Sequence, residues 1–117
     1  MNKDNIGFKG EEYACNYLEN KEYQIIARHF MCNQGEIDIV AKDKSELVFI
    51  EVKTRTNLKY GNPVDAVDKN KTKHIWNATK FYLYKNNLEK EYVRFDVIEV
   101  YIIAKGYRIN HIKNVMM

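Results

Sequence analysis

Proline and cysteine are scarce in this sequence of 117 residues, which has one proline, Pro63, and two cysteines, Cys15 and Cys32. Two cysteines without a metal-ligand spacing are too few for a disulfide framework or a structural zinc site, so we expect both thiols to be reduced. No apolar run approaches the roughly 20 residues that a membrane-spanning helix needs. The first residues also lack the apolar run and cleavage site of a signal peptide, which predicts a cytoplasmic protein.

Neither sign of charge dominates, since the formal net charge is only +3. Such a balance permits a polyanionic partner without requiring one. The hydrophobic content of 45% can fill a core, and the charged content of 30% argues against a disordered or membrane protein. The length predicts one domain over residues 1–117. Basic residues cluster in two segments, one with Lys53, Arg55 and Lys59 and the other with Lys69, Lys71 and Lys73.

The hydrophobic pattern alternates between helical spacing and the features of β-strands. It predicts a helix over residues 4–20, strands over 23–31, 36–41 and 47–54, a helix over 68–86, and strands over 92–103 and 107–112. The segment 47–54 is nearly continuous hydrophobe, which is typical of a strand covered on both faces, so it should be central. In segment 36–41, Ile37, Ile39 and Ala41 should share one face. The order favours an α/β fold with a mixed five-stranded sheet flanked by helices.

Two carboxylates, Asp38 and Glu51, lie in the middle of predicted strands with apolar neighbours on both sides. Burying such groups as isolated charges is costly, which indicates a function. Lys53 follows Glu51 by two residues and therefore shares its face, roughly 7 Å along the strand. If the two strands form a hairpin, the three side chains can converge. The alternative for any one carboxylate–lysine pair is a surface ion pair at a sheet edge.

This trio suits phosphodiester chemistry. Two neighbouring carboxylates, Asp38 and Glu51, can bind a hard divalent cation such as Mg²⁺ or Mn²⁺. The cation would polarise a phosphodiester oxygen and lower the pKa of a bound water molecule. The Lys53 ammonium could position the attacking water or stabilise developing negative charge.

Two helical residues are further candidates. Glu11 falls at the border of the apolar face of the first helix and could supply a third acidic group, although a solvated carboxylate is an equal alternative. Lys71 lies on the apolar stripe of the second helix, where it either extends its ammonium to solvent or meets a carboxylate or phosphate. Lys69 and Lys73 should face solvent.

The remaining charged residues receive simpler interpretations. Arg94 and Asp96 alternate with apolar residues on a late strand and are predicted to form a buried structural ion pair. Arg55 could contact a phosphate. The three histidines, His29, His74 and His111, have no ligand spacing, and no role is predicted for them.

At this point the chain resembles a known family, the YraN-like (UPF0102) proteins, small bacterial proteins related to Holliday junction resolvases. The resemblance covers nearly the whole chain. It rests on Gly7-x-x-x-Glu11-x-x-Ala14, Gly35-Glu36-Ile37-Asp38, Val48-Phe49-Ile50-Glu51-Val52-Lys53-Thr54-Arg55, Lys71 with Ala78, and Arg94-Phe95-Asp96-Val97.

The resemblance implies the restriction-endonuclease-like, or PD-(D/E)xK, nuclease fold. It further implies that Glu11, Asp38 and Glu51 hold the metal together with Lys53, and that Lys71 completes the site. One departure is that isoleucine rather than proline precedes Asp38, which changes nothing chemically.

Two functions remain open at this point. The first is a Mg²⁺-dependent (or Mn²⁺-dependent) endonuclease that acts on structured or branched DNA, with a homodimer as one way to cover a large junction. The second is a non-catalytic nucleic-acid-binding accessory protein in DNA processing or uptake. Either would bind nucleic acid through Arg55, Lys59, Lys69 and Lys73, and cleavage assays discriminate between them.

Overall fold

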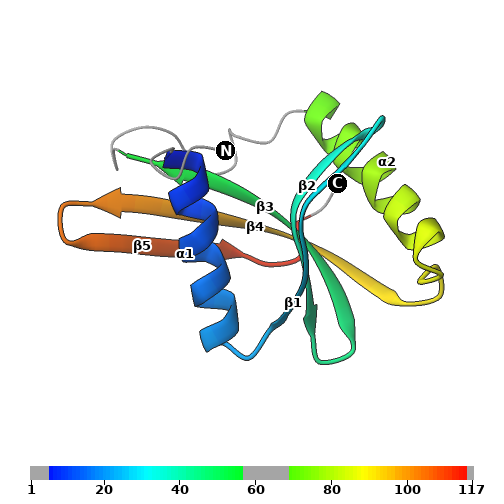
Figure 1. Cartoon of the computed structure of the whole chain (residues 1–117), viewed down its shortest axis with the longest axis horizontal. Coiled ribbons are helices and arrows are strands. Elements are labelled where there is room, and N and C mark those ends of the chain that lie inside the picture. The colour runs from blue at the N-terminus through cyan, green and yellow to red at the C-terminus, as the bar shows by residue number, and fades with distance from the viewer. Residues whose placement is uncertain (1–5, 57–68, 116–117) are drawn as a thin grey trace.

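The computed structural model describes residues 6–56 and 69–115. All seven predicted elements are present, each within a few residues of its predicted bounds (Figure 1). They are α1 (Ile6–Asn20), β1 (Gln24–Cys32), β2 (Gly35–Asp43), β3 (Glu46–Arg55), α2 (Lys69–Lys85), β4 (Tyr92–Ile103) and β5 (Gly106–Ile112). Neither of these helices is long and apolar enough to cross a membrane.

The five strands form one mixed sheet in the order β1-β2-β3-β4-β5. Only β3 and β4 are parallel, and every other neighbouring pair is antiparallel. The prediction of a central third strand is therefore confirmed. Its apolar residues cover both faces because each face packs against a different helix.

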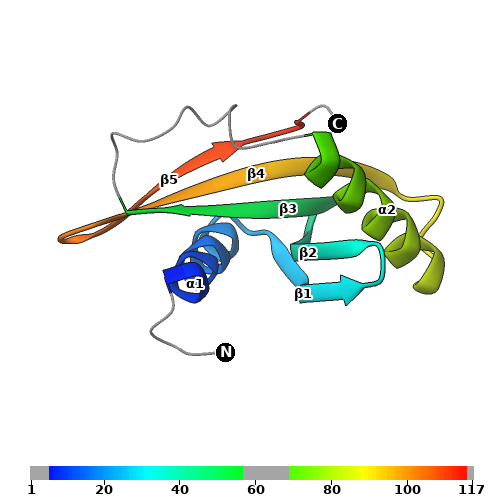
Figure 2. The ribbon, with the colours of Figure 1, turned by 90° about the horizontal axis from the view of Figure 1, so that it is seen from above.

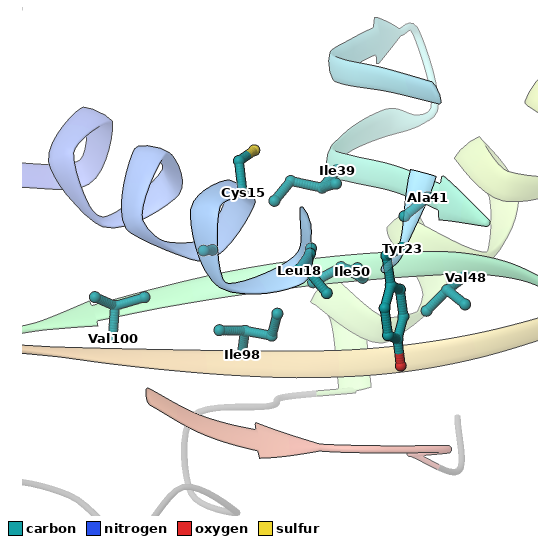
Figure 3. Packing of buried hydrophobic residues seen from close by; sticks show 10 residues of the cluster. Cys15, Leu18, Tyr23, Ile39, Ala41, Val48, Ile50, Ile98 and Val100 are labelled. Atoms are coloured by element: carbon teal, nitrogen blue, oxygen red, sulfur yellow. The ribbon is translucent and has the colours of Figure 1, made fainter. Parts of the chain in front are cut away.

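The first face of the sheet packs against α1, which lies in front of β4 and β5 in Figure 1 and beneath β3 in Figure 2. Alternate residues of β3, Val48 and Ile50, point to this side. The cluster drawn in Figure 3 consists of Ala14, Cys15, Leu18, Tyr23, Ile39, Ala41, Val48, Ile50, Ile98 and Val100. Burial raises the pKa of the Cys15 thiol to about 11, as expected for an inert core cysteine.

The second face packs against α2. The intervening residues of β3, Leu47 and Phe49, point to this side and contact Ala78 and Tyr82 in one buried cluster. The prediction that Ile37 shares a face with Ile39 and Ala41 is wrong, because Ile37 belongs to this second cluster. The alternation breaks at Asp38, where β2 stops pairing with β3.

A buried charge network ties β4 to the rest of the sheet. Arg94 donates two hydrogen bonds of 3.0 Å to the carboxylate of Asp96, which confirms the predicted ion pair. Arg94 also donates to Tyr23, Asp43 and Glu46. His111, for which no role was predicted, lies with its Nε2 2.7 Å from Asp96. Burial alone would raise the pKa of Asp96, but hydrogen bonds from His111, Arg94 and the Asn114 amide outweigh it and lower that pKa.

Candidate functional site

The site lies where β2 and β3 separate. Their antiparallel pairing runs from Asp43 and Glu46 to Ile39 and Ile50, and β2 continues beyond that point paired only with β1. In Figure 1 the turn of the β1–β2 hairpin and the end of β3 point apart. At the point of separation, Oδ2 of Asp38 accepts a hydrogen bond of 2.8 Å from the backbone amide of Val52. The side chain thus takes the place of the next ladder bond, which fixes the carboxylate between the two strands.

Glu51 and Lys53 occupy the same face of β3 just beyond this point. The Lys53 ammonium lies 2.8 Å from Oε1 of Glu51, and both side chains are largely buried. Glu51 and Asp38 line one small cavity of about 30 Å³, together with Glu36, Ile37, Ile50 and Ile75. That volume has room for about two water molecules. The three residues predicted to converge are therefore brought together.

Glu11 reaches the sheet because α1 approaches β3 very closely at Gly10. A Cβ atom on Gly10 would lie 1.9 Å from Oγ1 of Thr54, so only glycine allows this approach. Glu11, the next residue, is 4% exposed. The alternative of a solvated carboxylate is therefore wrong. Burial raises the pKa of Glu11, while His29 and Arg28 oppose the rise and the negative charge of Asp38 adds to it.

Glu11 and Glu51 lie on different sides of Asp38. Glu11 and Asp38 line an open hollow of about 400 Å³, whose other residues are Ile6, Gly7, Phe8, His29, Val52 and Thr54. Glu51 lines the small cavity described above. Asp38 borders both spaces and is the common member of the site.

Each oxygen of the Glu11 carboxylate has its own partner on β1. Arg28 Nε lies 3.3 Å from Oε1, and His29 Nε2 lies 2.8 Å from Oε2. His29 has a φ of +51°, in the left-handed region. That conformation costs a residue other than glycine about 1–2 kcal/mol. The His29 side chain is 37% exposed and that of Glu11 only 5%, so the contact gives a buried carboxylate oxygen a hydrogen-bond partner.

The donor set fits a hard cation that keeps much of its hydration shell. Within residues 6–56 and 69–115, no three His, Cys, Asp or Glu side chains converge closely enough to hold a metal ion. Mg²⁺ is commonly held by one or two carboxylates with several waters retained. Asp38 and Glu51 beside a cavity of water size match that requirement, whereas a structural zinc site would need four N or S ligands.

The predicted basic residues are only partly accounted for. Arg55 Nη2 lies 3.7 Å from Oε2 of Glu99. Lys73 is exposed on α2, as predicted. Lys59 and the side chains of Lys69 and Lys71 lie outside the described residues.

Glu99 is a residue that the sequence interpretation missed. It lies on β4 opposite Lys53 in the parallel register and is fully buried. Its Oε1 accepts a hydrogen bond of 2.8 Å from Nδ2 of Asn110. The signal was present, because Glu99 stands between Ile98 and Val100 in the same way that Asp38 stands between two isoleucines.

Comparison with known proteins assigns the chain to a family. A family model described as "Uncharacterised protein family UPF0102" matches residues 10–100. The chain belongs to the UPF0102 family. Its matched segment contains Glu11, Asp38, Glu51, Lys53 and Lys71, so all the predicted catalytic positions lie inside the family region.

The relatives of this UPF0102 protein match it over almost their full length. The UPF0102 protein of Clostridioides difficile (strain 630) is 46% identical over 114 residues, which cover 97% of this chain and 98% of the relative. That of Caldicellulosiruptor saccharolyticus is 40% identical over 116 residues, with coverage of 97% and 98%. One from Clostridium botulinum (strain 657 / Type Ba4) is 47% identical over 116 residues, with coverage of 97% and 94%.

Proposed function

We propose that this UPF0102 protein is a Mg²⁺-dependent endonuclease of the PD-(D/E)xK type that hydrolyses phosphodiester bonds in structured or branched DNA. The observation that carries the proposal is the meeting of Asp38 with Glu51 and Lys53 at the point where β2 leaves β3. Carboxylates that are held in a sheet interior by backbone and lysine contacts are expensive to maintain without a function.

Each residue has a separate role in this proposal. Asp38 and Glu51 would hold the cation, and Glu11 would supply a third acidic group from the far side of Asp38. When bound, Mg²⁺ (or Mn²⁺) polarises a phosphodiester oxygen and lowers the pKa of a coordinated water molecule. Lys53, held 2.8 Å from Glu51, is a fixed cation that orients the attacking water or stabilises negative charge in the transition state. By the family resemblance, Lys71 would complete the site.

The substrate proposal rests on charge and size. The net charge is +3, and Arg55 and the exposed Lys73 offer phosphate contacts, to which Lys59 and Lys69 would add. A chain of 117 residues has little surface beyond the site, so a branched junction would be covered by two copies acting as a homodimer.

The test is cleavage of branched, flapped and single-stranded DNA in Mg²⁺ or Mn²⁺ by the wild type and two variants. Asp38→Asn and Lys53→Met should each lower the cleavage rate by about 10²-fold or more, since each removes a charge that acts in the transition state. Lys105→Met, in the exposed β4–β5 turn, is the charge-matched control and should cleave like the wild type.

Equal cleavage by all these proteins would refute the assigned site. If the wild type cleaves none of the substrates yet binds them, with affinity that falls as salt rises, the non-catalytic accessory function replaces the nuclease. Binding that does not respond to salt argues against a nucleic-acid partner altogether.

A further inference from the structure

His29 interrupts the regular conformation of β1. Its neighbours Arg28 and Phe30 pair with Ile39 and Ile37, which places His29 opposite Asp38 in the register. Its φ of +51° is left-handed, a conformation that is uncommon for residues other than glycine and clusters at functional sites. The strain at His29 therefore coincides with the point where Asp38 enters the candidate site.

The left-handed turn changes the direction of the side chain. Consecutive residues of a strand normally point to opposite faces. Arg28 and His29 nevertheless both contact Glu11, one at each carboxylate oxygen. The Glu11 carboxylate is thereby fixed in orientation from two directions, in the hollow that it shares with Asp38.

The left-handed conformation of His29 costs free energy, and the fold keeps it where the side chain reaches a buried carboxylate of the candidate site. Strain that a fold retains beside a candidate site indicates a role for the residue that carries it. The contact partner indicates the role of His29, because Glu11 is almost fully buried and lines the same hollow as Asp38.

We propose that His29 is a positioning residue that holds the Glu11 carboxylate toward Asp38, so that Glu11 contributes to divalent-cation binding. This inference rests on the proposed metal-dependent function. It assigns to His29 an outer-shell role, in which a hydrogen-bond partner orients a ligand without touching the cation.

The test is a calorimetric titration of the full chain with Mn²⁺ in the absence of nucleic acid. His29→Gly relieves the strain and leaves Oε2 of Glu11 without the imidazole partner, so it should weaken Mn²⁺ binding by about 10-fold or more, as loss of an outer-shell partner does. His29→Gln places an amide N–H donor about as far from the backbone as Nε2 of His29, and it should recover most of the affinity. Combining His29→Gly with Glu11→Gln should weaken binding no further than Glu11→Gln alone.

Each outcome decides the inference. Wild-type affinity in His29→Gly, or a double variant weaker than Glu11→Gln, overturns it. A wild type that does not bind Mn²⁺ overturns it together with the proposed metal dependence. Binding that depends on His29 in a protein that cleaves no DNA supports the inference and refutes only the hydrolysis.

Discussion

Asp38 has a structural contact that can be separated from its proposed chemistry. Its Oδ2 accepts the Val52 amide at 2.8 Å, in the place of a ladder bond between β2 and β3. Asp38→Ala deletes this acceptor, whereas Asp38→Asn keeps an oxygen in the same position and removes only the charge. The two variants therefore differ in the one hydrogen bond.

The expected magnitude follows from the cost of a partly buried amide that loses its partner, about 1–3 kcal/mol. For a domain of this size, 1 kcal/mol lowers the unfolding midpoint by about 4 °C. Asp38→Ala should thus unfold about 4–12 °C below Asp38→Asn by the same conversion.

The assay is thermal unfolding followed by circular dichroism, with EDTA present so that cation binding does not contribute. Equal midpoints for the two variants would refute the structural role of the Asp38–Val52 contact. Both variants should cleave at least about 10²-fold more slowly than the wild type, because both lack the charge. A loss of activity in Asp38→Ala is assigned to chemistry only where Asp38→Asn shows it too.

Three further outcomes are expected. Gly10→Ala should lower the unfolding midpoint, because overpacking against Thr54 costs about 1–3 kcal/mol. This cost exceeds the gain in helix propensity. An unchanged midpoint contradicts the close approach of α1 to β3. The lowered pKa of Asp96 means that its stabilisation is complete above the unfolded value of about 3.9 and is lost as pH falls below it. Below that pH, the free energy of unfolding should fall less steeply with decreasing pH in Asp96→Asn than in the wild type. An identical pH dependence of the two proteins refutes the assignment. Iodoacetamide at pH 8 should label Cys32 before Cys15 in a mass-spectrometric time course, since Cys15 is buried with a pKa of about 11; the reverse order contradicts that burial.

Most of the fold could be predicted because it follows from local hydrophobic pattern. The central position of β3 was readable from its unbroken apolar run, and α2 from the stripe that includes Ala78 and Tyr82. That the Ile37 side chain points to the second face, toward α2, could not be predicted from the sequence. This orientation results from β2 leaving β3, which depends on pairing between strands and not on the residues of β2 alone.

The residues of the candidate site were likewise only partly predictable from the sequence. Asp38, Glu51 and Lys53 were identified because polar residues stand out in apolar strands, and the same signal would have found Glu99. His29 carried no such signal. Its contact with Glu11 depends on a left-handed backbone, and local sequence does not specify that conformation for a histidine.

The parallel pairing of β3 with β4 also has a consequence for folding. Glu46 pairs with Tyr92, so the two strands that form the centre of the sheet are distant in the chain. During synthesis, the apolar strand β3 emerges with one edge whose backbone groups stay unpaired until β4 arrives. Such edges promote self-association. A chain cut before β4 would keep Asp38, Glu51 and Lys53. It should nevertheless aggregate, because β3 would lack one of its two neighbouring strands.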